Sequence, residues 1–448
     1  MEDAICLLGL DVGSTTTSLL LARVPRVRNC VTGRSEFGAP QFLAQPEAVF
    51  TPFNGERIDG AALERQLDEW LADPALPPIE AGGILLTGLA AQSANAAALR
   101  ERLRRRLGDA LVAAAPDPRL ESWLAFHGGC GRLSAARPEE IFLNLDIGGG
   151  TTNLALGRAG EVRATASLWI GARHVGFDPG TRRVRAASAV GRRLLEGVSA
   201  KAGDVLREAQ VKDIAEFCAR RLRDFAAGRS IEDWLVDAPW NAPPDPPGQI
   251  LLSGGVGELF YQCRAGADFP IPSPFGDLGA DLARALADSL PASADIPPHR
   301  GRATVMGITL HSTEISGATI YVSPRVDLPL EEVPILGELA FAGDRPALPG
   351  EKSGVIGLRL AGAPPSAEAL KSLAARLGRR LDETGSPVLV LLLESDLGKT
   401  LGSYLTDWGN APRRVVVLDE LSVPRSARFV RVGARRASGV PVIFYGLV

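Results

Sequence analysis

FLNLDIGGGTTNLALGRAGEV, residues 142–162, ends an apolar run with Asp146 and follows it with three glycines and two threonines. A second apolar run begins directly after the threonines. Glycine adopts backbone conformations closed to other residues and leaves room for a ligand to approach. The stretch therefore predicts a β-hairpin with a glycine-rich tip and a carboxylate beside that tip.

The N-terminus repeats this pattern. Residues 7–24, LLGLDVGSTTTSLLLARV, align without gaps with residues 142–159, FLNLDIGGGTTNLALGRA. The identical residues of the two tips are Asp11 with Asp146, Gly13 with Gly148, Thr16 with Thr151 and Thr17 with Thr152. A repeat at this long spacing predicts two similar lobes that each open with the same hairpin, not a short-period solenoid.

The residue types of the tips indicate polyphosphate binding. Successive backbone N–H groups at glycines can point at an anion, and hydroxyl groups add further donors. Carboxylates repel phosphate, so the two aspartates fit a Mg²⁺ ion that keeps its own waters. For either hairpin alone, a glycine turn capped by aspartate is the better interpretation, whereas the aligned pair favours a clamp. The candidate residues are Gly13, Ser14, Thr15, Thr16, Gly148, Gly149, Gly150, Thr151 and Thr152, with Asp11 and Asp146 as water-mediated Mg²⁺ ligands.

A third element completes a nucleotide site. QILLSGGVGELF, residues 249–260, predicts a buried strand, then Gly254 and Gly255, then a helix. Paired glycines at such a junction let a base or ribose lie against the backbone. The chain has no complete P-loop motif, because ESDLGKT (residues 394–400) has Leu393 where the first glycine belongs. The role of this segment stays open.

Composition restricts the function classes. A chain of 448 residues exceeds one ordinary core, so two lobes or domains are expected. The net charge of −3 offers no basic face for nucleic acid or a membrane surface. No apolar run approaches the roughly 20 residues of a membrane span, and we expect no membrane partner. Five scattered cysteines and four isolated histidines suggest neither disulfides nor a metal centre, and favour a reducing cytoplasm.

Strand-like and helix-like segments alternate, which predicts an α/β protein. Asp59 is expected to cap a helix in residues 56–73, and Ser93 one in residues 93–111. Further helices are expected in residues 188–209, 281–290 and 368–381. Strands are expected in residues 84–87, 111–114, 318–322, 388–393 and 415–418.

The order of the three glycine motifs resembles that of the actin, Hsp70 and hexokinase superfamily. Its phosphate 1, phosphate 2 and adenosine motifs resemble residues 8–21, 143–156 and 251–259. The resemblance implies a two-lobed α/β fold around a nucleotide cleft. Residues 119–131 stand where the first connecting helix is placed, and residues 301–311 are a poorer candidate for the second. The implied parts are 1–137 (first lobe), 138–299 (second lobe, with phosphate 2 and adenosine motifs) and 300–448 (returning to the first lobe).

Within the superfamily the chain resembles the EutA family, the reactivating factors of ethanolamine ammonia-lyase. The segments that carry this resemblance are VFTPFNGERIDGAAL (49–63), ILLTGLAAQSANA (84–96), PDPRLESWLAFHGG (116–129), LLSGGVGELFY (251–261), STEISGATIYV (312–322) and ESDLGKTLG (394–402). The resemblance implies a chaperone-like ATPase that uses ATP and Mg²⁺ to release damaged cobalamin from its partner enzyme. Asp11 and Asp146 would position the metal, and Glu121 would orient the attacking water.

Three alternatives share the nucleotide site. A small-molecule kinase would need a substrate hydroxyl and a base in the cleft. An actin-like filament protein would polymerise with nucleotide, and an iron–sulfur ATPase activator would need clustered cysteines. Reactivation is the preferred interpretation. The sequence leaves open whether the chain forms a homo-oligomer and whether it enters a microcompartment.

Overall fold

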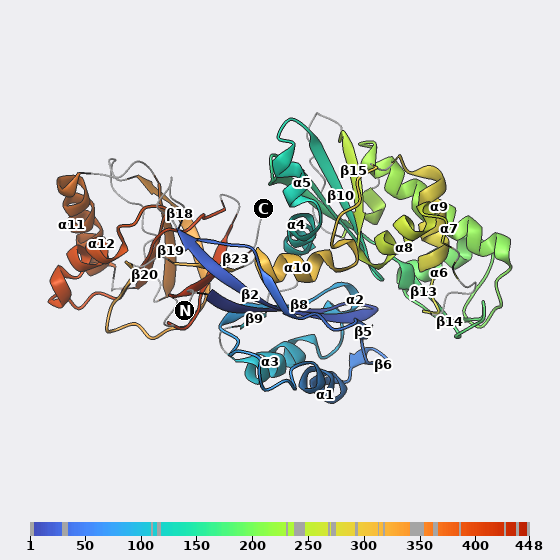
Figure 1. The fold of residues 1–448 in the computed structure, drawn as a ribbon, viewed down its shortest axis with the longest axis horizontal. Coiled ribbons are helices and arrows are strands. Elements are labelled where there is room, and N and C mark those ends of the chain that lie inside the picture. The colour runs from blue at the N-terminus through green and yellow to red at the C-terminus, as the bar shows by residue number, and fades with distance from the viewer. Residues whose placement is uncertain are drawn as a thin grey trace.

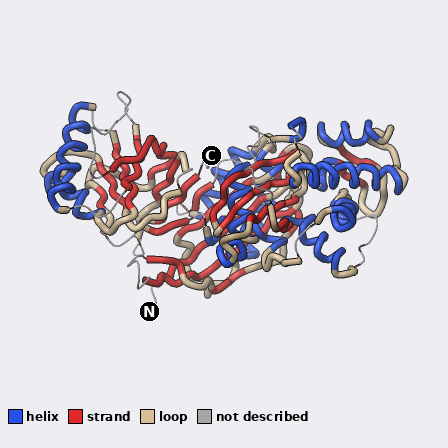
Figure 2. Tube along the Cα trace, turned by 90° about the horizontal axis from the view of Figure 1, so that it is seen from above, coloured by secondary structure: helices blue, strands red, loops and turns tan. Residues whose placement is uncertain are grey.

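The computed structural model describes residues 4–28, 35–108, 111–113, 118–229, 232–236, 247–267, 269, 275–291, 294–311, 313–316, 319–340, 354–361, 366–384, 387–424, 427–435 and 439–445. Helices and strands alternate along the chain, which confirms the α/β class. Two lobes and a C-terminal sheet lie around a pair of packed helices, α4 and α10 (Figure 1). Seen from above, the molecule is elongated (Figure 2).

The first lobe is a sheet in the order β3-β2-β1-β8-β9, with β4 and β5 also paired to β2. Leu63 and Leu67 of one helix and Leu99 and Leu103 of another pack into its core. The strands are β1 (Ala4–Val12), β2 (Thr16–Arg28), β3 (Ser35–Phe37), β4 (Gln41–Ala44), β5 (Val49–Phe50), β8 (Ala81–Leu86) and β9 (Leu111–Ala113), with the ribbon β6 (Phe53–Asn54) and β7 (Arg57–Ile58). The helices are α1 (Gly60–Trp70), α2 (Gly88–Ala91) and α3 (Ala96–Leu107).

The second lobe is a sheet in the order β12-β11-β10-β15 that belongs to a larger core with several helices. Its strands are β10 (Ile141–Ile147), β11 (Thr152–Arg158), β12 (Glu161–Leu168) and β15 (Gln249–Ser253), with the ribbon β13 (Val175–Phe177) and β14 (Val184–Ala187). Its helices are α6 (Ala189–Gly197), α7 (Glu208–Ala226), α8 (Gly254–Arg264) and α9 (Gly279–Ser289), with short 3₁₀ turns η1 (Ala172–His174), η2 (Glu232–Trp234) and η3 (Arg300–Arg302).

The two lobes open with the same hairpin in the same register. Asp11 faces Ser18 across β1 and β2, and Asp146 faces Asn153 across β10 and β11, which are aligned positions of the repeat. In each lobe the first strand then pairs in parallel with a later strand, β8 or β15. The duplicated two-lobed fold expected from the sequence is therefore confirmed.

Two helices join the lobes. α4 (Pro118–Gly129) packs against β11 and β12 of the second lobe, and α10 (Ala303–Leu310) packs against β1 of the first. A short helix, α5 (Gly131–Ala136), follows α4. A Cβ added to Gly128 would lie 1.9 Å from the Ala303 carbonyl oxygen, and one added to Gly307 would lie 2.1 Å from that of Leu124. The backbones of α4 and α10 are thus in direct contact.

The C-terminal third forms a sheet of its own, in the order β16-β23-β22-β18-β19-β20-β21-β17. Its strands are β16 (Thr313–Ile315), β17 (Tyr321–Val322), β18 (Leu330–Ala340), β19 (Val355–Ala361), β20 (Val388–Leu393), β21 (Val415–Leu418), β22 (Phe429–Val432) and β23 (Pro441–Tyr445). Helices α11 (Ala367–Glu383) and α12 (Gly398–Leu405) and the turn η4 (Asp407–Gly409) complete it. The predicted divisions after residues 137 and 299 stay predictions.

Several local predictions are confirmed and two are wrong. Asp59 caps α1 as expected, but α3 begins after Asn95 instead of Ser93, and neither residue caps it with its side chain. The helix predicted in residues 188–209 ends at Gly197, because residues 203–206 form backbone hydrogen bonds with residues 182–184, at the start of β14. Helix α7 was not predicted. Ala114 and Ala318, at the ends of two predicted strands, lie outside the described residues.

None of the described helices is both long enough and apolar enough to cross a bilayer.

The contact between α4 and α10 gives a stability prediction. Gly307→Ala should lower the urea midpoint of unfolding, with a cost of about 1–3 kcal/mol, because the added methyl group overlaps the Leu124 carbonyl. Gly197→Ala is the control, since a Cβ at Gly197 meets nothing within 4 Å. Circular dichroism during urea titration measures both, and equal midpoints for the two variants would contradict the close packing.

Candidate functional site

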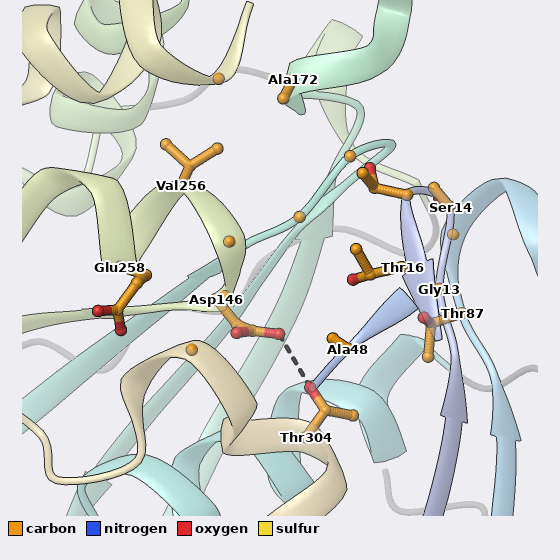
Figure 3. A pocket seen from close by; sticks show the side chains of 18 of the residues that line it. Gly13, Ser14, Thr16, Ala48, Thr87, Asp146, Ala172, Val256, Glu258 and Thr304 are labelled. Carbon is orange, nitrogen blue, oxygen red and sulfur yellow. Dashed lines mark hydrogen bonds between the residues drawn. The ribbon is translucent and has the colours of Figure 1, made fainter. Parts of the chain in front are cut away.

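A cleft of about 510 Å³ lies between the two lobes. Both hairpin tips, the start of α8 and the first turns of α4 and α10 line it (Figure 3). The structure brings together every predicted site residue except Thr152. Those lining the cleft are Asp11, Gly13, Ser14, Thr15, Thr16, Glu121, Asp146, Gly148, Gly149, Gly150, Thr151, Gly254 and Gly255.

Thr152 is the predicted site residue that does not line the cleft. Its side chain is fully buried and its hydroxyl group donates to the Ile170 carbonyl oxygen at 2.8 Å. Thr152 is the first residue of β11, where side chains alternate between the two faces of the sheet, so Thr151 reaches the cleft and Thr152 points into the lobe. The residue stabilises the hairpin and does not line the site.

The two aspartates stand at the ends of equivalent strands, and their hydrogen-bond donors come from elsewhere in the chain. Thr87, just after β8, donates to Asp11 Oδ1 at 3.1 Å. Ser253, at the end of β15, donates to Asp146 Oδ1 at 2.8 Å. Thr304 of α10 donates to Asp146 Oδ2 at 3.1 Å, as Figure 3 shows. Asp146 is therefore fixed by both its own lobe and the connecting helix.

Burial controls the charge of both carboxyl groups. Desolvation, and to a smaller extent the nearby Asp146 charge, raise the pKa of Asp11 to about 7 against the hydrogen bond from Thr87. Desolvation also raises the pKa of Asp146, against the hydrogen bonds from Ser253 and Thr304. Both groups would ionise more readily beside a cation, since an opposite charge favours the charged form.

The two tips have the same turn and lie face to face. The Gly13 N–H donates to the Thr16 carbonyl at 2.9 Å, and the Gly148 N–H donates to that of Thr151 at 3.0 Å. A Cβ added to Gly149 would lie 2.4 Å from Thr15 Oγ1, so the tips of the two lobes touch. Glycine is required here because the opposite tip already occupies the space.

Arg173, in turn η1, links the two tips. Its backbone N–H donates to the Gly149 carbonyl at 2.6 Å, and its Nη1 donates to the Ser14 carbonyl of the other lobe at 2.7 Å. Burial lowers the pKa of the Arg173 guanidinium, while the Asp277 carboxylate raises it. The sequence analysis did not identify Arg173, because nothing in its neighbourhood marks it as different from the many other arginines.

The start of α8 forms an open platform. Gly254 has φ +79°, and a Cβ there would lie 2.6 Å from the Ile147 carbonyl, so other residues would be strained. A Cβ at Gly255 would instead meet nothing within 4 Å, although the residue lines the cleft. This platform can accept a flat group without a clash.

Thr87 and Ser253 were also not predicted as site residues, although the sequence contained a signal for them. Thr87 ends a predicted strand and Ser253 follows one, and parallel strands bring their carboxyl ends together at one edge of a sheet. Thr304 carried no such signal, because its helix is distant in sequence. Within the described ranges no group of three or more histidine, cysteine, aspartate or glutamate residues could hold a metal ion.

The raised pKa of Asp11 predicts a specific pH dependence of stability. Between about pH 4 and pH 7 the folded state keeps a proton that the unfolded state has lost, so stability falls as pH rises. Asp11→Asn should have a urea midpoint close to the wild type at pH 4 and a higher one at pH 8, measured with EDTA present. Asp213→Asn, on the exposed side of α7, should follow the wild-type profile. Identical profiles for Asp11→Asn and the wild type would show that Asp11 titrates normally.

Similarity to known proteins identifies the family of this chain. Residues 3–345 match the family described as Ethanolamine utilisation protein EutA. The ethanolamine ammonia-lyase reactivase EutA of Salmonella typhimurium is 33% identical over 344 residues, covering 73% of this chain and 71% of the relative. The protein of the same name from Escherichia coli is 32% identical over 341 residues, with the same coverage of both chains.

Among solved structures, ethanolamine utilization protein EutJ from Carboxydothermus hydrogenoformans matches with a TM-score of 0.33 and 15% identity, covering 68% of this chain and 89% of that one. The activator of the 2-hydroxyisocaproyl-CoA dehydratase from Clostridium difficile, solved with bound ADPNP, also has a TM-score of 0.33, with 13% identity and coverage of 68% and 94%. The family match and the identity to the two reactivases together place the chain: it belongs to the EutA family.

Proposed function

We propose that this chain is an ATP-dependent reactivating factor for ethanolamine ammonia-lyase, which releases damaged cobalamin so that intact coenzyme can bind. One observation carries the nucleotide part: two hairpin tips of matched register face each other across one cleft, each with an aspartate beside it. Membership of a family that includes two ethanolamine ammonia-lyase reactivases supports the choice of partner.

The cleft suits a nucleoside polyphosphate. Its volume of about 510 Å³ lies in the usual range for ligand pockets. Backbone N–H groups and the hydroxyl groups of Thr15, Thr16 and Thr151 can donate to phosphate oxygens between the tips. The base and ribose would lie over Gly254 and Gly255, beside Val256 and Leu259, which also line the cleft.

The residues present fit a Mg²⁺ ion. Two buried carboxyl groups share one cleft, and the charge of Asp146 raises the pKa of Asp11, so a cation near both would relieve this repulsion. Asp11 and Asp146 would hold it through water, as Mg²⁺ usually retains part of its hydration shell. When bound, the ion would neutralise phosphate charge. Thr87, Ser253 and Thr304 fix the carboxylates for that purpose.

Glu121 is proposed to orient the attacking water. It lies in the first turn of α4 and lines the cleft with the aspartates. A carboxylate at this position can accept a hydrogen bond from a water that approaches the phosphates from the connecting helices.

Lobe movement would couple the nucleotide to the partner. The cleft is bridged by the Arg173–Ser14 hydrogen bond and, at its rim, by the edge-to-face pair of Phe50 and Phe275, with ring centroids 5.7 Å apart. A nucleotide held by both tips favours one lobe orientation, and loss of the γ-phosphate reduces that preference. The shift can distort a bound enzyme. The four described cysteines are unpaired, in keeping with the proposed cytoplasmic location.

The decisive experiment restores an inactive enzyme. Ethanolamine ammonia-lyase inactivated as its cyanocobalamin complex is incubated with this chain, Mg²⁺, ATP and adenosylcobalamin, and ammonia release is measured. Activity should return only with all components. Gly255→Val should abolish the recovery, because its side chain enters open cleft space without touching protein.

Gly337→Val is the matched control, since Gly337 is exposed on β18 and its Cβ would also meet nothing within 4 Å. It should reactivate like the wild type. Equal recovery with and without ATP would refute the nucleotide-driven mechanism. A chain that phosphorylates a small molecule and leaves the ammonia-lyase inactive would instead be a kinase.

The bridge between the tips gives a kinetic prediction. Arg173→Gln should speed dissociation of a fluorescent ADP analogue about tenfold, because a hydrogen bond from a charged group between the lobes is lost. Arg192→Gln is the control, since Arg192 donates to the Ala187 carbonyl within one lobe. Stopped-flow measurements compare the dissociation rates, and a wild-type rate for Arg173→Gln would show that Arg173 does not slow nucleotide release.

A further inference from the structure

A second cavity, of about 390 Å³, lies beside the connecting helices and is here called the hinge pocket. The last turn of α4, the start of α5 and the end of α10 form one side, and the segment before η3 and the segment around β4 form the other. Neither the nucleotide motifs nor the proposed reactivation uses it. Its lining residues are Ala39, Pro40, Phe42, His127, Gly128, Gly129, Arg132, Leu133, Pro298, His299, Met306, Leu310 and His311.

Three of the four histidines of the chain meet at this pocket, although the sequence separates them widely. The rings of His127 and His311 lie 5.4 Å apart, centroid to centroid, and are tilted by 35°. His127 also packs against Trp123 at 4.1 Å, and His299 contacts Phe42 edge-on at 6.1 Å. The pocket is therefore lined by four flat rings, those of Phe42, His127, His299 and His311.

The imidazoles are neutral and retain hydrogen-bonding capacity. Burial lowers the pKa of His127 to about 3 and that of His311 to about 4, and burial also lowers the pKa of His299. A neutral imidazole offers one donor and one acceptor. Within the described part of the chain, no side-chain hydrogen bond from these three histidines is found.

Arg132 is the charged residue that lines the hinge pocket. It is exposed, it lines the pocket together with His299 and His311, and its positive charge contributes to the lowered pKa of both imidazoles. Among the described residues Arg132 has no ion-pair partner. The rest of the lining is apolar, chiefly Phe42, Met306 and Leu310. Flat faces, neutral hydrogen-bonding groups and one guanidinium suit a planar ring that carries a carboxylate.

The position of the pocket would let such a ligand affect the nucleotide cleft through the connecting helices. α4 provides Glu121 to the cleft and His127 to the hinge pocket, and α10 provides Thr304 to the cleft and Leu310 to the pocket. The two helices touch backbone to backbone at Gly128 and Gly307, so they cannot shift independently without a clash. A ligand that wedges between their ends would change how they cross.

We propose that the hinge pocket binds a small planar aromatic carboxylate, with Arg132 pairing to the carboxylate and the imidazole rings stacking on the aromatic body, and that occupancy changes nucleotide affinity in the cleft. Only this last effect rests on the proposed nucleotide function.

The test uses two probes of nearly the same shape, 2-naphthoate and its neutral counterpart 2-naphthamide. Isothermal titration of the full chain, without nucleotide, should show one naphthoate site, with naphthamide at least about tenfold weaker. Arg132→Gln should remove this difference between the probes. Leu133→Trp, at a partly exposed lining position, should abolish binding of both by filling the pocket.

Arg163→Gln is the control, because Arg163 is an exposed arginine on β12 that does not line the pocket. It should bind both probes like the wild type. Absence of naphthoate binding to the wild type would overturn the proposal, and so would unchanged binding in Leu133→Trp. Equal affinity for the two probes would overturn the role of Arg132.

The coupling is measured separately. Saturating naphthoate should change the dissociation constant of Mg·ADP at least about fivefold in the wild type and leave it unchanged in Leu133→Trp. An unchanged constant in the wild type would refute the coupling. If ADP does not bind at all, the nucleotide proposal fails, while the naphthoate titration still decides the hinge pocket.

Discussion

Desolvation of two carboxyl groups, those of Asp11 and Asp146, in one cleft is the constraint on which the site depends, because it raises the pKa of both. Each is held by hydroxyl groups of other elements, and those of Asp146 come from β15 and from α10. The arrangement is therefore complete only when both lobes and the connecting helix are in place. Burial keeps a proton on Asp11 near neutral pH unless a cation is present.

The helices α4 and α10 link that cleft to the rest of the molecule. Their backbones meet directly at Gly128 and Gly307, and α10 also fits against β1, where a Cβ on Gly9 would lie 2.0 Å from Thr309 Oγ1. Packed backbones move as units, because close-packed interiors do not deform continuously. In the proposed mechanism, the pair of helices would carry a change of lobe orientation, and a ligand in the hinge pocket would act on the same pair.

Sequence-based predictions were wrong where tertiary packing opposed a local signal. Residues 188–209 have the composition of one helix, but the segment that ends in Leu206 pairs with the chain before β14, which ends the helix at Gly197. Thr152 matched its repeat partner Thr17, and both are fully buried. The repeat thus predicted equivalence correctly, and only the function assigned to this threonine was wrong.

The sequence by itself determined the two equivalent hairpins and the position of each aspartate at a glycine tip. These features depend only on residues that are close along the chain. Strand alternation and the small size of glycine act locally, and both are visible in residues 7–24 and 142–159. Only the tertiary structure decided that Arg173 bridges the tips, that Thr304 fixes Asp146, and that three separated histidines surround one pocket. Those residues come from segments far apart in the chain, and it is the packing of α4 against α10 and of lobe against lobe that brings their side chains together.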